Sequence, residues 1–340
     1  MSAEEPESAP TRESRKSGAL VSAVRWMENL GETGFAYLLL TPVFILLGAI
    51  ALYPLLRTFE LSLYTNVIGV GDAEWVGFEH YVDLFTGEAD SNFPGTTQFL
   101  WGDVTVNGEF PFVHVERLLR SALAVTLIFT VVSVFFETLI GFGQALVLDQ
   151  DFYGRRWVRV AIIIPWAIPI VIQGMIFFLM FHPSAGFATD ILAPYGIVAE
   201  TNTLNDPASG LLLAIVADIW KTSAFMALLI LAGLQSIDRS LYDVAKVAGA
   251  SRWQQFRLIT FPLILPTLGV AVLFRTIDAM RIYGLIDISS SCSVVPSLSC
   301  MVVSTFTTQR GLSSAVAFVT AGVIAIAVLG VIYQQYREGF

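Results

Sequence analysis

Five charged side chains lie within otherwise apolar stretches of this sequence, and their chemistry has to be accounted for first. Charged groups are costly in lipid and usually face a bundle interior, a water-filled path or one another. The five are Glu137, Asp218, Lys221, Arg275 and Asp278. Arg275, Asp278 and Arg281 are spaced three apart, so on a helix they share a flank and can pair. They could therefore form structural ion pairs or line the path of a polar solute.

The sequence shows no catalytic constellation. The dipeptide Lys221-Thr222 lacks the preceding glycine loop that would cradle a nucleotide phosphate. The histidines lack metal-ligand spacing, and there is no nucleophile elbow and no paired-carboxylate signature. The histidines are His80, His114 and His182. We expect no enzymatic activity, no metal and no cofactor bound by this chain; if ATP powers the protein, a separate chain hydrolyses it.

The elements that would position these charges are long apolar segments. The 340-residue chain is 55% hydrophobic and 14% charged, with a mean hydropathy of +0.69, whereas a soluble protein carries about 25% charged residues. A bilayer core of roughly 30 Å needs about 20 apolar residues per helix. We predict an all-α integral membrane protein with six transmembrane helices, near residues 35–59, 121–148, 158–181, 209–234, 258–280 and 313–333.

The basic residues predict the orientation of the chain. Twelve of the 19 Lys and Arg fall on the side that holds both termini, and four fall in the opposite loops. Loops rich in Lys and Arg stay in the cytoplasm. We therefore expect a multi-pass protein of the cell membrane with both termini cytoplasmic. The predicted parts are a cytoplasmic tail with a possible interfacial helix (1–34), a transmembrane domain (35–333) with a long extracellular loop (60–120), and a cytoplasmic C-terminus (334–340).

The stretch 241–266 is a short polar, small-residue segment between two long apolar ones. Its charges make it too polar to sit in lipid. They are Asp243, Lys246, Arg252 and Arg257. We predict two short helices that meet at Gly249, because glycine can take the turn that ends a helix. Because glycine has no side chain, another protein can approach the backbone closely at this turn, which indicates a docking loop. An amphipathic interfacial helix is the alternative.

This stretch resembles the cytoplasmic coupling loop, often called the EAA loop, of permease subunits in binding-protein-dependent ABC importers. In that family the loop reads roughly E-A-A-x-x-D-G-A, followed by an aromatic residue, Phe and a Pro-containing entry into the next span. Here Asp243 stands where Glu is usual, and Ala248 stands where Asp is usual. The second departure removes a charge, so an ATPase contact made by that Asp is not expected here. The first three places of the motif are filled by Asp243, Val244 and Ala245, and the last two by Gly249 and Ala250; Phe256, Pro262 and Pro266 follow at the expected distances.

Other stretches extend the resemblance to the sugar-type branch, similar to maltose and glycerol-phosphate permeases. They are Leu40-Thr-Pro42, Tyr53-Pro54, Asp151 to Arg156, Pro165 to Pro169, Trp220-Lys-Thr222 and Leu234 to Ile237. After Tyr283 the family usually has Phe-Asp and a Gly-Pro-like loop, and here Gly284 and residues 289–301 fill that place.

The resemblance implies the helical bundle of a type I ABC importer permease. It also implies a second permease subunit, two ATPase subunits that use the ATP, an extracellular solute-binding protein, a sugar or polyol as the solute, and no nucleic acid. The coupling loop would span 236–258, and its ATPase-coupling residues would be Asp243, Ala245, Gly249, Ala250, Arg252 and Phe256.

Two other transporter classes remain open. An ion-coupled secondary transporter would need no ATPase, but the sequence shows no inverted pair of broken hydrophobic segments, and the small-residue loop would have no role. An ABC permease for a non-sugar solute is nearer, because selectivity in such systems rests largely on the binding protein.

The substrate path and the cysteines give two further predictions. Flat aromatic faces suit the C–H patches of sugar rings, and charged groups bind hydroxyls. The candidate path residues are Trp220, Lys221, Asp278 and Tyr283. The two cysteines, Cys292 and Cys300, lie eight apart in a predicted extracellular loop, where a disulfide could persist. Two buried free thiols are the alternative, and a tetrahedral zinc site is excluded because no His lies nearby.

Overall fold

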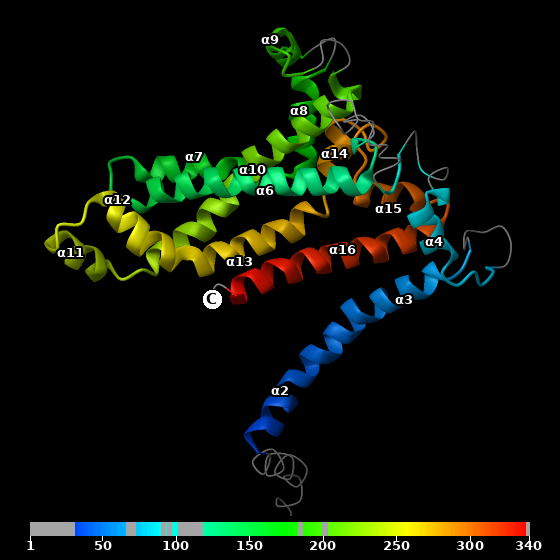
Figure 1. Cartoon of the computed structure of the whole chain (residues 1–340), viewed down its shortest axis with the longest axis horizontal. Coiled ribbons are helices and arrows are strands. Elements are labelled where there is room, and N and C mark those ends of the chain that lie inside the picture. Colours follow the sequence, from blue (N-terminus) through cyan, green and yellow to red (C-terminus); the bar gives the residue numbers. More distant parts are fainter. Residues whose placement is uncertain are drawn as a thin grey trace, which may run out of the picture. The chain divides into compact units, whose positions relative to one another are not determined.

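The computed structural model describes residues 31–65, 73–89, 93, 97–100, 118–182, 186–198 and 203–337. The regular elements in these ranges are helices, together with two isolated β-bridges (Figure 1). The predicted tail and interfacial helix of residues 1–30 lie outside the described residues. The chain divides into two compact units, Met1–Arg57 and Thr58–Phe340. The longer helices are α2 (Glu32–Leu47), α3 (Tyr53–Ser62), α6 (Ala122–Asp149), α7 (Arg155–Ala167), α8 (Ile170–Met180), α10 (Pro207–Gln235), α13 (Phe261–Ala279) and α16 (Arg310–Arg337).

Five helical segments in the described ranges are long and apolar enough to cross a membrane. They are Glu32–Ser62, Ala122–Asp149, Pro207–Gln235, Arg252–Ala279 and Arg310–Tyr333. The first joins α2 to α3 through a π-helical turn at Gly48–Leu52. The fourth joins α12 (Arg252–Gln255) to α13 through a second one at Phe256–Thr260. These five agree with five of the six predicted spans.

The remaining predicted span, 158–181, is not one straight helix. It is the pair α7 and α8, bent by 90° at a short break. Ile168 in the break is extended, with φ −74° and ψ 128°. A residue that precedes proline is pushed away from the helical region, and Pro169 itself has no N–H to continue the ladder. The predicted span 158–181 therefore corresponds to a bent pair of helices, and it counts as the sixth span if the pair is taken together.

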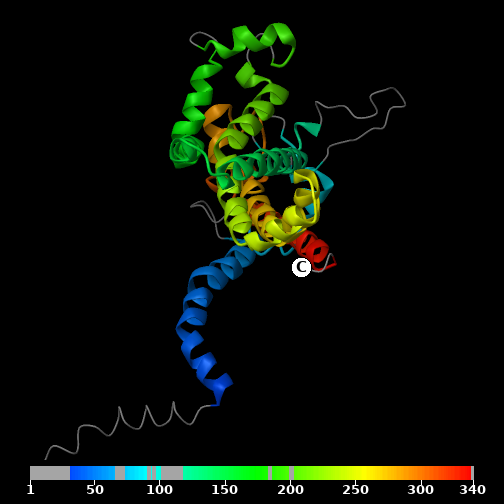
Figure 2. The same ribbon diagram turned by 90° about the vertical axis from the view of Figure 1, so that its left-hand side faces the viewer.

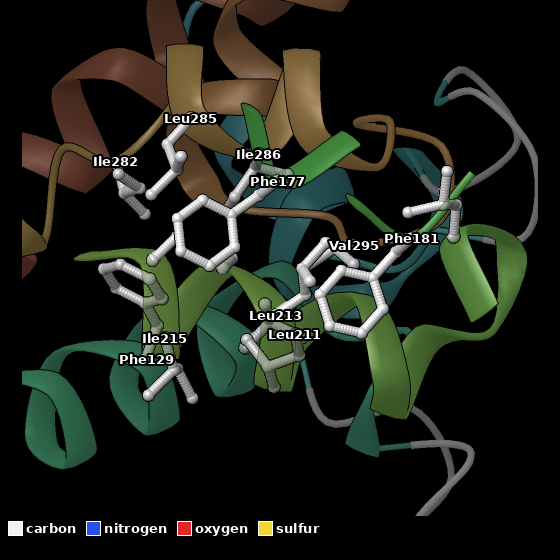
Figure 3. Packing of buried hydrophobic residues seen from close by; sticks show 14 of the residues in the cluster. Phe129, Phe177, Phe181, Leu211, Leu213, Ile215, Ile282, Leu285, Ile286 and Val295 are labelled. Carbon is white, nitrogen blue, oxygen red and sulfur yellow. The ribbon is translucent and has the colours of Figure 1, made fainter. Parts of the chain in front are cut away.

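The core of the second unit is the close pair formed by α6 and α10. A Cβ added to Gly141 on α6 would lie 2.6 Å from the Cβ of Met226 on α10, so only glycine permits this approach. The larger buried cluster lies at the end that also holds α14 (Gly284–Ser289), where Phe129, Phe177 and Leu285 meet (Figure 3). The central helix pair can thus hold polar groups at fixed positions.

The two ends of this bundle carry different structures. At one end, α11 (Arg239–Val247) and α12 form the connection between α10 and α13 (Figures 1 and 2). At the other end lie α14 and α15 (Leu298–Phe306), between α13 and α16. The described part of the loop 60–120 includes α4 (Glu79–Thr86), and the His80 ring contacts the Tyr64 carbonyl at 3.1 Å.

Candidate functional site

The connection between α10 and α13 forms a two-helix elbow, as predicted. Helix α11 ends at Val247, Gly249 has φ +78°, and α12 begins at Arg252. The Ala250 N–H donates to the Ala245 carbonyl at 2.9 Å, which closes the end of α11. A Cβ added to Gly249 would meet no atom within 4 Å, so the outer face of the turn is open. We call residues 239–256 the elbow.

Short polar and aromatic contacts fasten the elbow to the bundle. Arg239 donates to Asp149 of α6 at 2.7 Å, and this hydrogen bond raises the pKa of Arg239. The Tyr242 hydroxyl lies 2.9 Å from the Thr260 hydroxyl. Phe256 lies among three other aromatic rings, with its centroid 5.4 Å from that of Trp253. These contacts leave the elbow little freedom to move separately from α6 and α13.

The predicted coupling residues lie on different faces of the elbow. Asp243 and Arg252 are exposed, and Asp243 accepts from Lys246 at 3.2 Å. Ala245, Ala250 and Phe256 are half-buried. Three exposed apolar side chains were missed by the sequence reasoning: Val244, Val247 and Trp253. Their apolar character at a solvent-facing turn was the signal that could have identified them.

The start of α11 depends on Asp238. The Asp238 Oδ1 accepts from the Ser240 N–H at 2.9 Å. This hydrogen bond lowers the pKa of the Asp238 carboxyl below its ordinary value. A lowered carboxyl pKa gives stability that is present above the ordinary value and is lost as pH falls through the value in the folded protein.

We therefore expect the cap to be intact at neutral pH and lost only in acid. Asp238→Ala should speed amide hydrogen exchange across α11, measured by mass spectrometry, whereas Asp238→Asn should keep exchange slow because its amide oxygen still accepts. Equal exchange in Asp238→Ala and the parent protein would rule out the capping role.

Inside the bundle, Arg275 of α13 binds three carboxylates. Its Nε and Nη2 donate to the two oxygens of Glu137 at 2.5 and 3.0 Å. Nη2 also donates to Asp218 of α10, and Nη1 donates to Asp278 at 2.7 Å. The side chains of Glu137, Asp218 and Arg275 are 0%, 8% and 2% exposed, whereas that of Asp278 is 69% exposed. We call these four residues the Arg275 cluster.

The cluster lies inside the bundle, close to the end of α13. Glu137 is near the middle of α6 and Asp218 is in the central part of α10. One residue after Asp278, α13 ends, and a short connection leads to α14. Helix α14 lies against the start of α8, just after the break, where Gly174 faces Ile288. Non-helical backbone at membrane depth is tolerated where it is buried in protein or lines a water-filled cavity.

The predicted path residues are only partly brought together. Lys221 is half-buried and lies within electrostatic reach of Asp218, Asp278 and Arg275. Trp220 is 40% exposed, and its ring lies 5.9 Å from that of Phe177. The Tyr283 hydroxyl donates a hydrogen bond to the Asp287 carboxylate at 3.2 Å. The expected pairing of Arg275 with Asp278 is present, whereas Arg281 donates to the Ile277 carbonyl.

Gln173 is a polar residue that the sequence reasoning did not single out. It is buried, and its Nε2 donates to the Ala217 carbonyl at 2.6 Å, which ties α8 to α10 beside Asp218. The sequence signal that could have identified Gln173 is a single amide side chain in an otherwise apolar segment that follows two prolines.

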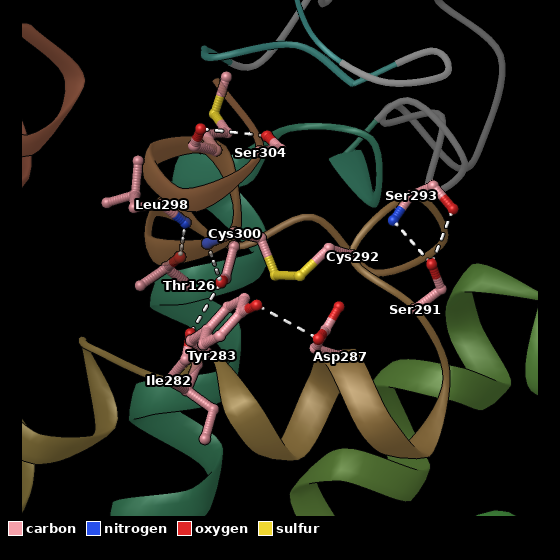
Figure 4. The surroundings of a disulfide bond; sticks show 12 residues. Thr126, Ile282, Tyr283, Asp287, Ser291, Cys292, Ser293, Leu298, Cys300 and Ser304 are labelled. Carbon is pink, nitrogen blue, oxygen red and sulfur yellow. Dashed lines mark hydrogen bonds between the residues drawn. A yellow bond between two sulfur atoms is a disulfide. The ribbon is translucent and has the colours of Figure 1, made fainter. Parts of the chain in front are cut away.

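At the opposite end from the elbow, Cys292 and Cys300 are joined by a disulfide (Figure 4). The bond connects the segment after α14 to the first turn of α15. That turn is capped by the Ser297 hydroxyl, which accepts from the Cys300 N–H at 3.1 Å. The Ser297 hydroxyl in turn donates to the Ile282 carbonyl at 2.8 Å.

Mass analysis of unreduced protein should find no thiol that reacts with an alkylating reagent. Reduction should then expose two reactive thiols. Because the loop closed by the bond is short, we expect its removal in a Cys292→Ser/Cys300→Ser variant to cost about 2–3 kcal/mol of stability. Two alkylated cysteines without prior reduction would contradict the bond.

Comparisons with known proteins identify the family. Residues 137–337 match the binding-protein-dependent transport system inner membrane component family. The chain belongs to this family. It is thus a multi-pass membrane permease of the binding-protein-dependent class.

Three similar proteins are named for the transport of a sugar or a sugar derivative. The trehalose/maltose transport system permease protein MalF of Thermococcus litoralis is 32% identical over 255 residues, which cover 75% of this chain and 76% of that protein. The sulfoquinovosyl glycerol transport system permease protein SmoG of Agrobacterium fabrum is 36% identical over 264 residues, covering 77% and 75%. The trehalose transport system permease protein SugA of Mycobacterium tuberculosis is 31% identical over 256 residues, covering 75% and 72%.

Solved structures show the same fold. A chain of a bacterial alginate ABC transporter, crystallised with an alginate pentasaccharide-bound periplasmic protein, aligns with a TM-score of 0.69. The alignment covers 95% of this chain and 98% of that chain at 20% identity, so it supports the fold alone.

Proposed function

We propose that this chain is the permease subunit of an ATP-driven importer that moves a sugar or related polyol into the cell. It acts with a second permease subunit, two ATPase subunits and an extracellular solute-binding protein. The chain itself hydrolyses no ATP. The sugar-transport names of relatives that are 31–36% identical over about three quarters of the chain support the solute class.

The elbow is the observation that carries the coupling role. It combines an open glycine turn, exposed apolar side chains at Val244, Val247 and Trp253, and tight attachment to the bundle. A partner that binds the outer face would therefore pull α6 and α13 with it. ATP-driven closure of the ATPases would move the elbow as a rigid lever, and the bundle would switch between inward-facing and outward-facing states.

The orientation follows from this role. The elbow has to face the cytoplasm, where ATP is available, which agrees with the excess of Lys and Arg on that side. The opposite end, with α14, α15 and the described part of the loop 60–120, then faces outward toward the binding protein. Both termini are accordingly placed in the cytoplasm, and the coupling loop spans 236–258.

Uptake of labelled sugars tests the proposal. Cells that lack the gene should lose uptake of one sugar or polyol, and the restored gene should return it. An uncoupler that collapses ion gradients should leave uptake intact while ATP is maintained, and ATP depletion should stop it. Uptake that follows the ion gradient instead would favour an ion-coupled carrier.

A further inference from the structure

Asp278 is a carboxylate that a lipid-facing position would not tolerate. Its side chain is 69% exposed, although its partner Arg275 is 2% exposed and lies against the middle of α6. A charged group at this depth has to meet water, a polar partner or a solute, because lipid cannot solvate it. The exposed part of the Asp278 side chain therefore faces water, a polar partner or a solute.

The buried guanidinium of Arg275 positions the Asp278 carboxylate. A guanidinium has five N–H donors in a rigid fork, and here four contacts reach three carboxylates. The two-bond contact with Glu137 and the contact with Asp218 hold the guanidinium between α6 and α10. The Nη1 of this held guanidinium donates to Asp278 at 2.7 Å, which ties one oxygen of that carboxylate to Arg275.

The surroundings of Asp278 suit a neutral, hydroxyl-rich ligand. A carboxylate only accepts hydrogen bonds, so a hydroxyl O–H is a matching donor. Lys221, nearby on α10, supplies an ammonium donor for a second hydroxyl. The break between α7 and α8 and the end of α13 provide irregular backbone of the kind that lines binding sites in other transporters.

We propose that Asp278 accepts hydrogen bonds from hydroxyls of the transported sugar, and that Arg275, held by Glu137 and Asp218, is its positioning residue. This inference rests on the proposed function as a sugar importer. It assigns roles within the path and favours neutral over anionic solutes, because a negatively charged solute would be repelled by the outward carboxylate.

The test uses the assembled transporter in proteoliposomes, with trehalose-loaded binding protein in excess outside and ATP inside. If trehalose is not the solute, the neutral sugar identified by the uptake screen replaces it. The measured quantity is sugar delivered per ATP hydrolysed. Asp278→Asn should lower this ratio roughly tenfold, because a charge-assisted hydrogen bond is lost. ATP hydrolysis stimulated by the loaded binding protein is measured on the same samples and supplies the denominator of this ratio.

Arg275→Lys should lower the ratio similarly, because a lysine ammonium cannot hold three carboxylates in the fork geometry. The double variant should lower the ratio of sugar delivered to ATP hydrolysed no further than the more severe of the two single variants, since both substitutions act through one contact. Asp190→Asn, which alters an exposed carboxylate on α9 (Ala188–Leu192), is the matched control and should match the parent protein.

The outcomes separate the possible explanations. A parent complex without ATP-driven sugar uptake would overturn the proposed function itself. A parent complex that transports, combined with a normal ratio in Asp278→Asn, would overturn the inference alone. Poor recovery of the second permease with Asp278→Asn would also overturn it, because Asp278 would then be a subunit contact.

Discussion

Replacing Gly249 by Trp is expected to reduce transport to background while the chain stays inserted in the membrane. The glycine has φ +78° at the tip of the elbow, and no atom lies within 4 Å of an added Cβ. An indole there would meet little of its own chain, so the bundle should still form. It would instead project into the surface that the ATPase has to approach closely.

Gly154 offers a matched control for this substitution. It has φ +91° in the turn before α7, and a Cβ added there would also meet nothing within 4 Å. Both Trp variants therefore carry a similar backbone penalty of about 1–2 kcal/mol. Uptake and recovery of the ATPase should be lost in Gly249→Trp and kept in Gly154→Trp. Normal uptake by Gly249→Trp would refute the docking role of the elbow.

Replacing Arg275 by Met is expected to cost about 3–5 kcal/mol of stability, the range measured when one partner of a buried ion pair is removed. Glu137 and Asp218 would then remain buried without their shared cation. Thermal unfolding of the detergent-solubilised transporter should show a large fall in Tm.

Two further variants test whether the loss of stability in Arg275→Met comes from the unpaired buried carboxylates. Arg281→Met is the control, because Arg281 is exposed and donates a hydrogen bond to the nearby backbone carbonyl of Ile277. A triple variant, Arg275→Met/Glu137→Met/Asp218→Leu, should regain much of the lost stability, because no unpaired buried charge remains. An unchanged Tm in Arg275→Met would show that the cluster does not hold the bundle together.

The elbow was predictable from sequence because its signals are local. A glycine between two short charged segments specifies a turn, and the apolar segments on either side specify spans. Five of the six spans follow from hydropathy alone. The sixth is a bent pair of helices, and its bend was not predicted because Pro169 was treated as part of a family motif rather than as a break in the helix.

The Arg275 cluster could be predicted only in part. Helical spacing showed that Arg275 and Asp278 can pair. It could not show that Glu137, 138 residues away along the chain, supplies the two-bond partner. That contact depends on how α6, α10 and α13 pack, which is decided by close approaches such as the one at Gly141. The exposure of Asp278 follows from where α13 ends, and local sequence did not specify that end.

The most direct test of the account is purification of the tagged chain in mild detergent, with its partners identified by mass spectrometry and ATP hydrolysis measured on the same sample. We expect a P-loop ATPase, a second six-span permease and hydrolysis that rises when solute-loaded binding protein is added. Gly249→Trp should lose the ATPase from the same preparation. A stable homo-oligomer without an ATPase, from cells in which the tagged chain supports uptake, would contradict the importer account and favour an ion-coupled carrier.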